Sequence, residues 1–297
     1  MKNQVPFKSG YISIIGEPNV GKSTLLNAMM GEKLAIVTPK PQTTRNRITG
    51  IVTTDEYQII FLDTPGVLEP KYRLHNRMVR AAYSAIKDAD VVLYIIDVSQ
   101  PAHRLERQIL DKIKKTGQKA ILVINKIDLV PKPALLPLIA EYSEKFPFVE
   151  IVPISATLGD GVAQLREFII QYLPEGPPYF PADQLSDLPE RFFVAEIIRE
   201  QIFLHTQQEI PYASSVVVEE FKERPNGKNY IRAMIYVERQ SQKGILVGGG
   251  GRTIKLIGQR ARADIERFLD APVFLDLYVS VKEDWRSDER KLKDMGY

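Results

Sequence analysis

The stretch "YISIIGEPNVGKSTLLNAMM", residues 11–30, joins an apolar β-branched run to a helical run through a glycine-containing loop. Gly16, Gly21, Lys22 and Ser23 match the pattern G-x-x-x-x-G-K-[ST] between a strand and a helix, as that pattern requires. Glycines let backbone N–H groups wrap phosphates, the lysine reaches the outer phosphates, and the serine hydroxyl ligates Mg²⁺. The stretch therefore predicts a nucleotide phosphate loop. Its residues are Gly16, Glu17, Pro18, Asn19, Val20, Gly21, Lys22, Ser23 and Thr24.

Around this loop, up to residue 173, short β-branched runs alternate with longer helical patterns, which is typical of an α/β fold with a mostly parallel sheet. Residues 47–54 and 57–63 are joined by a turn too short for a crossover helix, so we expect an antiparallel hairpin there. The expected strands are 11–16, 47–55, 57–63, 90–97, 119–126 and 149–155. The expected helices lie near 22–30, 75–87, 103–116, 133–146 and 161–173.

Residues 173–190 are rich in proline and show neither a helical nor a strand period, which indicates a linker. After it we expect an α+β domain in the order helix, strand, strand, glycine loop, helix, strand. The expected segments are 190–206, 214–224, 229–239, 252–269 and 273–281, with the turn "PNGK" at 225–228. The predicted domains are residues 1–173, the linker 174–190, and residues 191–297.

The composition is that of an ordinary globular protein of two domains, with 297 residues and a net charge of only +3. The absence of cysteine excludes disulfides, thiolate metal sites and a cysteine nucleophile. The amino terminus does not resemble a signal peptide, and no apolar run is long enough to span a bilayer. We expect a cytoplasmic monomer.

The tetrapeptide "NKID", Asn125 to Asp128, indicates which base is bound. Asp128 at the end of a buried strand can accept hydrogen bonds from the ring N–H and the exocyclic amine of guanine, a pair that adenine does not offer. Lys126 can lie along the base, and Asn125 can tie this loop to the phosphate loop. The sequence therefore predicts a site for GTP and GDP.

Two further motifs complete this site, in an order that chance does not explain. "DTPG" comprises Asp63, Thr64, Pro65 and Gly66. Asp63 can support the Mg²⁺ shell, and the Gly66 N–H can sense the third phosphate. "SAT" comprises Ser155, Ala156 and Thr157. In it the Ala156 backbone can hydrogen-bond the guanine carbonyl oxygen.

The position after Gly66 is Val67, where many GTPases have a glutamine that orients the attacking water. Another group must position that water, so we expect slow hydrolysis until a partner or an ion completes the site. In "PQTTR", either Thr43 or Thr44 can close on Mg²⁺ when GTP is bound, and the sequence does not choose between them.

A second glycine loop, "VGGGGRTIKLIG" at residues 247–258, lies in a run that has six basic residues and no acidic ones between Arg239 and Arg262. A glycine loop that opens a helix amid such charge suits a nucleic-acid backbone, as the G-x-x-G loops of KH domains do. The predicted RNA-binding residues are Gly248, Gly249, Gly250, Gly251, Arg252, Lys255, Lys243, Ile245 and Val247. Ile254 and Ile257 are further candidates to contact bases, although some of these apolar residues must belong to the core.

Together these motifs resemble the Era family of bacterial GTPases, which carry a carboxy-terminal type II KH domain. The resemblance runs through "GEPNVGKSTLLNAM", "TPKPQTTRNRI", "FLDTPGV", "NKIDLV", "GGGGRTIKLIGQRAR" and "APVFLDLYVSVKEDW". It implies binding to the 3′ end of 16S ribosomal RNA, a GTP-controlled role in small ribosomal subunit assembly, and membrane association for some members. It also implies that Asn19 holds K⁺ as an activator of hydrolysis, beside the catalytic residues Lys22, Asp63 and Gly66.

Gly249 and Gly250 depart from the family pattern, because many members carry a polar or basic residue inside this loop. Phosphate contacts should therefore rest on backbone amides and flanking arginines. Two other functions stay open at this point. One is a signalling GTPase that docks on a membrane or a protein and binds no RNA, and the other is a GTP hydrolase with a structural appendage. The basic flank of the second loop disfavours both.

Overall fold

The structure, a computed structural model, describes residues 6–100, 104–225 and 227–297. Its contacts divide the chain into two compact units. The first unit comprises the described residues up to Ala35, then 44–70 and 75–187, and the second comprises 36–43, 71–74 and 188–297. The start of the helix expected at residue 103, and residue 226 of the expected turn, lie outside the described residues.

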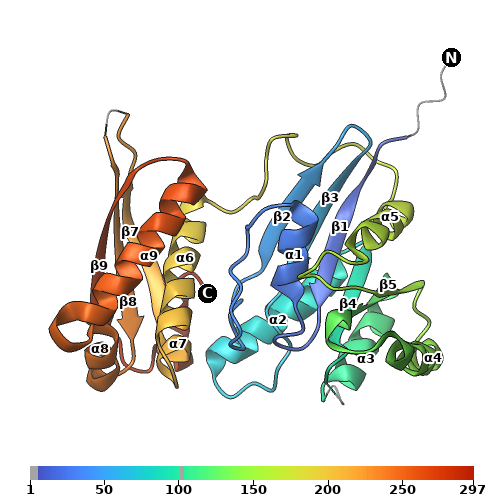
Figure 1. The fold of residues 1–297 in the computed structure, drawn as a ribbon, viewed down its shortest axis with the longest axis horizontal. Helices are drawn as coiled ribbons and strands as arrows, with labels where there is room; N and C mark the ends of the chain where they lie inside the picture. Colours follow the sequence, from blue (N-terminus) through green and yellow to red (C-terminus); the bar gives the residue numbers. More distant parts are fainter. Residues whose placement is uncertain (1–5, 101–103, 226) are drawn as a thin grey trace. The chain divides into compact units, whose positions relative to one another are not determined.

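The first unit is built on a six-stranded sheet in the order β2-β3-β1-β4-β5-β6 (Figure 1). Its strands are β1 (Lys8–Ile15), β2 (Ile48–Thr53), β3 (Tyr57–Asp63), β4 (Val91–Asp97), β5 (Lys119–Asn125) and β6 (Glu150–Pro153). The β2 and β3 strands pair antiparallel, as the short turn between them predicts, and the other neighbours pair parallel. The expected α/β fold is confirmed.

Helices cover both faces of this sheet, because alternate strand residues are buried on opposite sides. On one face Ile15 packs in a core with residues of three helices, α2 (Arg73–Asp88), α3 (Glu106–Thr116) and α4 (Leu135–Lys145). Ile12 and Ile14 alternate with Ile15 and are fully buried on the other face, on the side of α1 (Lys22–Met30) and α5 (Val162–Tyr172), which contact each other (Figure 1). Short 3₁₀ turns lie at Ile127–Leu129 and Lys132–Ala134.

The proline-rich stretch is fastened to the first unit up to residue 187 and is not a free tether. The side-chain oxygen of the fully buried Gln58 accepts hydrogen bonds from the N–H groups of Tyr179 (2.7 Å) and Phe180 (3.0 Å). Its amide nitrogen donates to the Phe180 carbonyl at 2.8 Å, and the Ile51 N–H donates to the Leu185 carbonyl at 2.8 Å. A polar core residue on β3 is satisfied in this way by backbone groups of the stretch.

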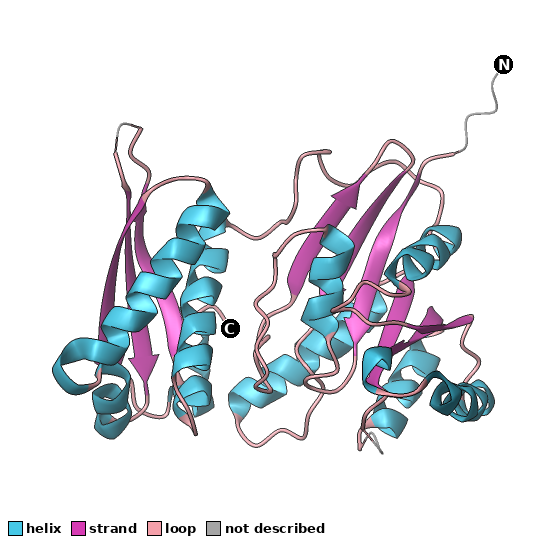
Figure 2. Cartoon of the chain, viewed as in Figure 1, coloured by secondary structure: helices cyan, strands magenta, loops and turns pink. Residues whose placement is uncertain are grey.

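The second unit is a three-stranded sheet in the order β7-β8-β9 with helices against one face (Figure 2). The β7 and β8 strands pair antiparallel, and β8 and β9 pair parallel. Its elements are α6 (Glu190–His205), α7 (Ile210–Ala213), β7 (Ser215–Lys222), β8 (Asn229–Val237), α8 (Gln240–Val247), a 3₁₀ turn (Gly249–Gly251), α9 (Arg252–Leu269), β9 (Val273–Val281), a 3₁₀ turn (Trp285–Ser287) and α10 (Glu289–Asp294).

Besides the four-residue helix α7, two longer helices of this unit were not expected from the sequence. The first is α8, which contains Gly244 and buries only Gln242 and Leu246, so its helical period is weak. The second is α10, which follows Trp285 at the carboxyl end. Trp285 is fully buried, donates from its indole nitrogen to the Ala213 carbonyl at 2.9 Å, and stacks on Tyr297.

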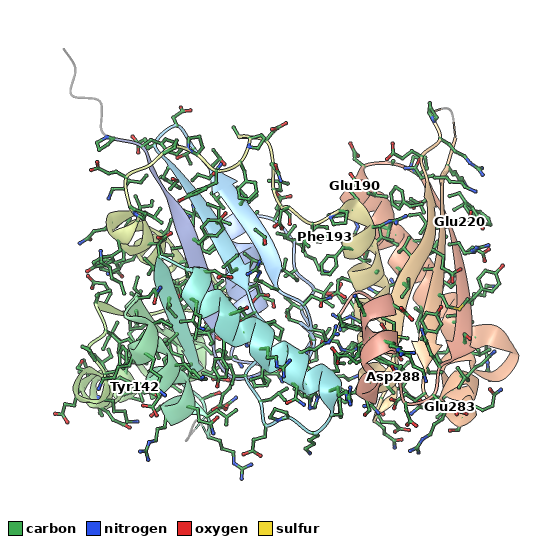
Figure 3. The ribbon with its side chains drawn as sticks, turned by 180° about the vertical axis from the view of Figure 1, so that it is seen from behind. Tyr142, Glu190, Phe193, Glu220, Glu283 and Asp288 are labelled. Atoms are coloured by element: carbon green, nitrogen blue, oxygen red, sulfur yellow. The ribbon has the colours of Figure 1, made fainter. Side chains whose placement is uncertain are left out.

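Figure 3 shows the side chains, with Tyr142 on α4 in the first unit and Phe193 on α6 in the second. Tyr142 packs in the core of the first unit. Phe193 contacts Phe192 edge to face and Phe268 of α9.

Among the described residues, no helix combines the length and the apolar character that crossing a membrane requires.

Candidate functional site

The phosphate loop leaves β1 and enters α1, and its glycines are dictated by close backbone and side-chain approach. A Cβ at Gly16 would lie 2.3 Å from the Ile95 carbonyl oxygen. Gly21 has φ of 100°, in the left-handed region, and a Cβ there would lie 2.2 Å from the Asn125 amide nitrogen. Neither position accommodates a side chain, so the loop keeps its N–H groups open to a ligand.

Lys22 is the first residue of α1 and is almost fully buried. Its ammonium group donates to the Glu17 carbonyl at 2.7 Å, across the loop. Burial lowers the pKa of Lys22 to about 8, against the opposing charges of Asp63 and Glu17. The negative charges near Lys22 do not offset the cost of burying its ammonium group, so the group is suited to bind an anionic ligand that enters the loop.

Three residues of the first unit come together here: Ser23 of α1, Asp63 at the end of β3, and Thr44 in the loop before β2. The Ser23 hydroxyl donates to Asp63 Oδ2 at 2.6 Å and lies 2.8 Å from the Thr44 hydroxyl oxygen. Asp63 is fully buried, and its Oδ1 atom has no hydrogen-bond partner among the described residues. Burial raises the pKa of Asp63 to about 6, although the Ser23 hydroxyl and Lys22 oppose that rise. Two hydroxyls and an unsatisfied buried carboxylate oxygen are the hard donor set that Mg²⁺ requires.

Thr43 lies in a different environment from its neighbour. Its hydroxyl donates to the Lys40 carbonyl at 2.8 Å and lies 2.7 Å from the Thr38 hydroxyl, within the segment 36–43. Its carbonyl accepts from Arg199 of α6 within the second unit. The structure therefore places Thr44, and not Thr43, beside Ser23 and Asp63.

The "DTPG" loop is pressed against the phosphate loop. The Thr64 hydroxyl donates to the Ile14 carbonyl at 2.7 Å, and a Cβ at Gly66 would lie 2.7 Å from the Pro18 backbone. The Val67 N–H donates to the Gly16 carbonyl at 3.0 Å, while the Val67 side chain is 1% exposed in the core. Val67 thus packs the loop in place and offers no group to a water molecule.

Asn125 connects the base-side loops to the phosphate loop. Its amide nitrogen donates to the Val20 carbonyl at 2.8 Å, and its oxygen accepts from the Ala156 N–H at 3.0 Å. The expected bond from the Ala156 N–H to guanine therefore has to share this donor with Asn125. Ser155 is fully buried and accepts from the Leu158 N–H at 3.2 Å, so it shapes the loop from inside.

Asp97, at the end of β4, is a site residue that the sequence motifs do not include. It accepts from the Lys126 ammonium group at 2.6 Å and from the Ser99 backbone N–H at 2.9 Å. Burial alone would raise the pKa of Asp97, but the bonds from Lys126 and Ser99 outweigh burial and lower it. Asp97 anchors Lys126, whose φ is 65°, while Asp128 is exposed toward solvent.

The second glycine loop lies between α8 and α9 and has its own close contact. A Cβ at Gly248 would lie 2.3 Å from the Thr253 hydroxyl, and Gly250 and Gly251 have φ of 62° and 77°. The Arg252 guanidinium donates to the Gly249 carbonyl at 3.1 Å. The loop is therefore a defined turn at the start of α9, with exposed backbone at Gly249 and Gly250.

A groove beside this turn runs between α9 and β9. Apolar side chains of α9 and β9 line it together with polar and basic side chains of α9. It is lined by Ile254, Lys255, Gly258, Gln259, Arg262, Leu275 and Leu277. Apolar contact for bases beside basic groups for phosphates is the chemistry of single-stranded RNA binding.

The predicted RNA-binding residues divide between this groove and its surroundings. Lys255 and Ile254 line the groove, whereas Ile245 is 53% exposed on α8 and Lys243 and Val247 are half-buried there. The expectation that Ile257 contacts bases is wrong, because its side chain is fully buried in the core. Arg262, Leu275 and Leu277 were missed, since only the pairing of α9 with β9 brings them together.

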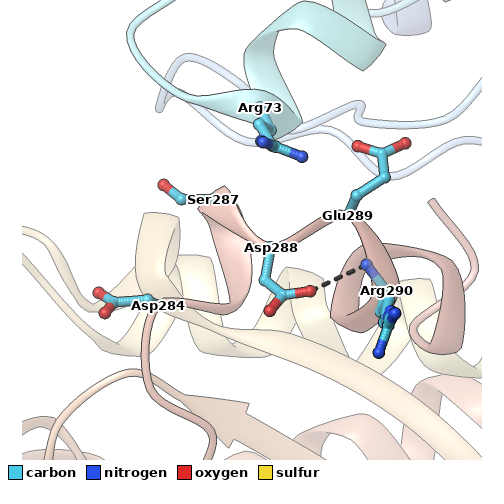
Figure 4. Close-up of a pocket in the computed structure, with 6 residues that line it drawn as sticks. All are labelled: Arg73, Asp284, Ser287, Asp288, Glu289 and Arg290. Carbon is cyan, nitrogen blue, oxygen red and sulfur yellow. Dashed lines mark hydrogen bonds between the residues drawn. The ribbon is translucent and has the colours of Figure 1, made fainter.

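A separate hollow in the second unit is lined by the side chains in Figure 4. Asp288 there accepts from the Arg290 N–H at 2.9 Å and so caps the short helix α10. Although acidic residues gather at this point, no group of three or more histidine, cysteine, aspartate or glutamate residues that could hold a metal ion occurs in the described part of the chain. None of the predicted site residues lies in this hollow.

The fold and these sites define a P-loop GTPase joined to a KH domain. The family of 50S ribosome-binding GTPases matches residues 11–126, and the KH domain family matches residues 209–286. The GTPase Era of Geobacter metallireducens is 52% identical over 98% of each chain, and that of Geotalea uraniireducens is 52% identical over the same shares.

Two solved structures match nearly the whole chain. The structure of a single-residue variant of Aquifex aeolicus Era bound to GDP·AlF₄⁻ has a TM-score of 0.95 and 42% identity, over 98% of this chain and 99% of that one. A structure of Era with MgGDPNP and nucleotides 1506–1542 of 16S ribosomal RNA has a TM-score of 0.94 and 43% identity, over the same shares. This chain belongs to the Era family of GTPases.

The contrast between the two threonines gives a direct test of the Mg²⁺ site. We expect Thr44→Ala to weaken Mg²⁺-dependent binding of the GTP analogue GDPNP by about tenfold, because it removes a hydroxyl beside Ser23 and Asp63. Thr43→Ala should change that affinity much less. The affinity for GDP should be near that of the wild type in both variants, because GDP lacks the third phosphate that closes the segment around Thr44. Calorimetric titration at fixed Mg²⁺ measures these affinities for the wild type and both variants. A larger loss of GDPNP affinity in Thr43→Ala than in Thr44→Ala would contradict the assignment.

Proposed function

We propose that this chain is a molecular switch that binds and hydrolyses GTP and binds single-stranded RNA in small ribosomal subunit assembly. One observation carries the proposal: two glycine turns, each opening a helix, expose backbone N–H groups in separate units of the same chain. The first turn has the base-side loop of a guanine site, and the second has an apolar groove flanked by basic residues. The relative that holds both a GTP analogue and 16S ribosomal RNA supports the 3′ end of that RNA as the target.

In the nucleotide site we assign the base to Asp128 and Lys126, with Asp97 and Asn125 as positioning residues. Asp128 is exposed and so open to a ligand, and Lys126 is fixed by its ion pair with Asp97 at 2.6 Å. The specificity for guanine follows from the carboxylate, which accepts two hydrogen bonds and donates none.

At the phosphates we assign Lys22 to the outer oxygens, Ser23 and Asp63 to the Mg²⁺ shell, and Thr44 to the closed GTP state. Held by these residues, Mg²⁺ would neutralise the charge that develops on the outer phosphates. We assign the third phosphate to the N–H of Gly66, whose backbone lies close to Pro18. These residues bind, orient and neutralise, which is most of what phosphoryl transfer needs from a protein.

Val67 leaves the positioning of the attacking water to another group. Asn19 lies exposed in the phosphate loop with φ of 65°. We assign it a K⁺ ion whose charge would act as an arginine finger does, a contribution of about 10³-fold where such fingers operate. A Na⁺ ion is too small for the same coordination.

The ion assignment predicts GTP turnover that is faster in potassium than in sodium buffer for the wild-type chain. Asn19→Ala should lose this preference, whereas Asn19→Asp should keep it, because it retains an oxygen donor. Steady-state hydrolysis in matched chloride buffers measures the ratio. Equal wild-type rates in the two salts would refute the ion and leave a partner or a backbone-held water as the agent.

The RNA assignment is tested by Gly249→Asp. The Gly249 backbone is outside the left-handed region, and its Cβ would approach only the flexible end of Arg252 at 3.2 Å, so the turn should survive. A carboxylate facing RNA phosphate should weaken binding by more than about tenfold. Gly249→Ala is the matched control and should bind RNA nearly as the wild type does. Aspartate at Gly248 is a poorer choice, because a side chain there collides with Thr253.

Fluorescence titration of the full chain with short single-stranded RNA, at several salt concentrations, gives the affinities. Wild-type binding should weaken as salt rises, because neutralised phosphates release counterions. GTP hydrolysis by Gly249→Asp, measured on the same preparation, should stay near wild type. RNA binding that is equal in the aspartate and alanine variants would contradict the proposal.

A further inference from the structure

The three-stranded sheet of the second unit has a second face that the RNA groove does not use. Ile231, Ala233 and Ile235 of β8 are fully buried against the helices. The residues that alternate with them point to the opposite face and are half-buried. We call this opposite face the outer face.

Aromatic side chains gather at one end of the outer face. The strand register aligns Lys222, Tyr230 and Phe274 across β7, β8 and β9. The Tyr230 and Phe274 rings are stacked, with centroids 5.9 Å apart and planes 15° apart, and Phe274 is 54% exposed. Tyr278, two same-face positions further along β9 and so about 13 Å away, is 49% exposed. Such exposure of large flat rings is the arrangement on which bases stack.

Cations lie beside the ring pair. The Lys222 ammonium group is 6.0 Å from the centre of the Tyr230 ring, and the Arg224 guanidinium is 5.8 Å from it. Both side chains extend from the end of β7 and the turn that follows it. The Lys222 ammonium group also pairs with Glu220 at 2.8 Å, and the Arg224 guanidinium adds positive charge where the phosphates of a stacked strand would pass.

The acidic residues of the outer face are engaged with other side chains. Arg232 pairs with Glu219 at 3.3 Å and with Glu220 at 3.1 Å, and Figure 3 shows Glu220 on β7. Asp276 accepts from the Tyr278 hydroxyl at 3.0 Å and from the Tyr230 hydroxyl at 3.5 Å. These bonds reduce the repulsion of phosphate and hold both tyrosine rings in place.

The other end of the outer face is covered by the chain itself. The Tyr297 hydroxyl lies 3.1 Å from the Ser215 hydroxyl, and the Lys282 ammonium group lies 5.3 Å from the centre of the Tyr236 ring. Residues of the carboxyl-terminal segment therefore contact the side chains at that end of the outer face. The ring pair and Tyr278 lie beyond it.

The groove and the outer face meet at one strand. The β9 strand is at the edge of the sheet, and its side chains alternate between the two faces. Leu275 and Leu277 line the groove, whereas Phe274 and Tyr278 lie on the outer face. Because Phe274 directly precedes Leu275 in β9, a single strand of RNA that leaves the groove across this edge would meet the aromatic rings next.

The geometry points to Phe274, Tyr230 and Tyr278 as a stacking platform for single-stranded RNA that continues from the groove over the edge of β9. The platform takes bases without reading their sequence, because every base has a flat face. It rests on the proposed RNA binding by the groove and extends the length of RNA that the chain holds. Continuity with the groove and the cations beside the rings favour RNA over a protein partner.

The test uses the full chain and RNAs from the 3′ end of 16S ribosomal RNA. One probe is a tetranucleotide, the length that a KH loop clamps, and two others extend it by four nucleotides at the 5′ or the 3′ end. We expect at least one extended RNA to bind the wild type more tightly than the tetranucleotide. The double variant Phe274→Leu, Tyr278→Leu should lose about tenfold in affinity for that RNA and nothing for the tetranucleotide.

Three controls separate stacking from other causes. The pair Phe274→Tyr, Tyr278→Phe keeps the rings and should bind as the wild type does. Tyr179→Leu removes an exposed ring from the first unit and should have no effect. Melting curves should show that the leucine variant is folded, since both rings are exposed.

The outcomes are distinct for the two proposals. Equal wild-type affinity for all three RNAs, or an unchanged extended-RNA affinity in the leucine variant, overturns the platform and leaves the groove in place. If the outer face bound a protein partner and not RNA, the leucine variant would keep its affinity for the extended RNA. Wild-type binding to none of the RNAs overturns both proposals.

Discussion

The hydrogen bonds of the Asn125 amide are the constraint on which the nucleotide site depends. They join the Val20 carbonyl of the phosphate loop to the Ala156 N–H of the last base-side loop, through a residue at the end of β5. Because Asn125 lies 2.2 Å from where a Gly21 Cβ would be, the same contact requires glycine in the phosphate loop. One side chain therefore fixes the distance between the loop that faces the phosphates and the loops that face the base.

The two units solve a similar problem with different means. In the first, buried groups such as Lys22 and Asp63 have shifted pKa values, and a ligand with opposite charges and a metal ion would satisfy them. In the second, the glycine turn is exposed and an apolar groove, not buried charge, faces the ligand. A buried, charge-matched site suits a nucleotide that is held and then cleaved. An open groove on an edge strand suits a polymer that passes through it.

Local motifs were enough to predict most of the fold and the nucleotide loops, because glycine spacing and strand alternation are properties of neighbouring residues. The β2–β3 hairpin and the family follow from them. Pairings between distant segments were not predictable. The choice of Thr44 depends on where Ser23 lies, and the role of Asp97 depends on the pairing of β4 with β5. Ile257 was misplaced because the basic charge around it does not reveal which side of α9 faces the core.

The claim that this chain is a guanine-nucleotide switch depends most on Asp128, whose carboxylate has to accept both hydrogen bonds from guanine. Asp128→Asn replaces one acceptor by a donor, which suits xanthine, where an oxygen stands in place of the amine. The decisive measurement is a competition between GTP and XTP for this variant, in which displacement of a fluorescent guanine nucleotide reports the binding of each. The account predicts that the preference shifts from GTP toward XTP. An unchanged preference for GTP would contradict it.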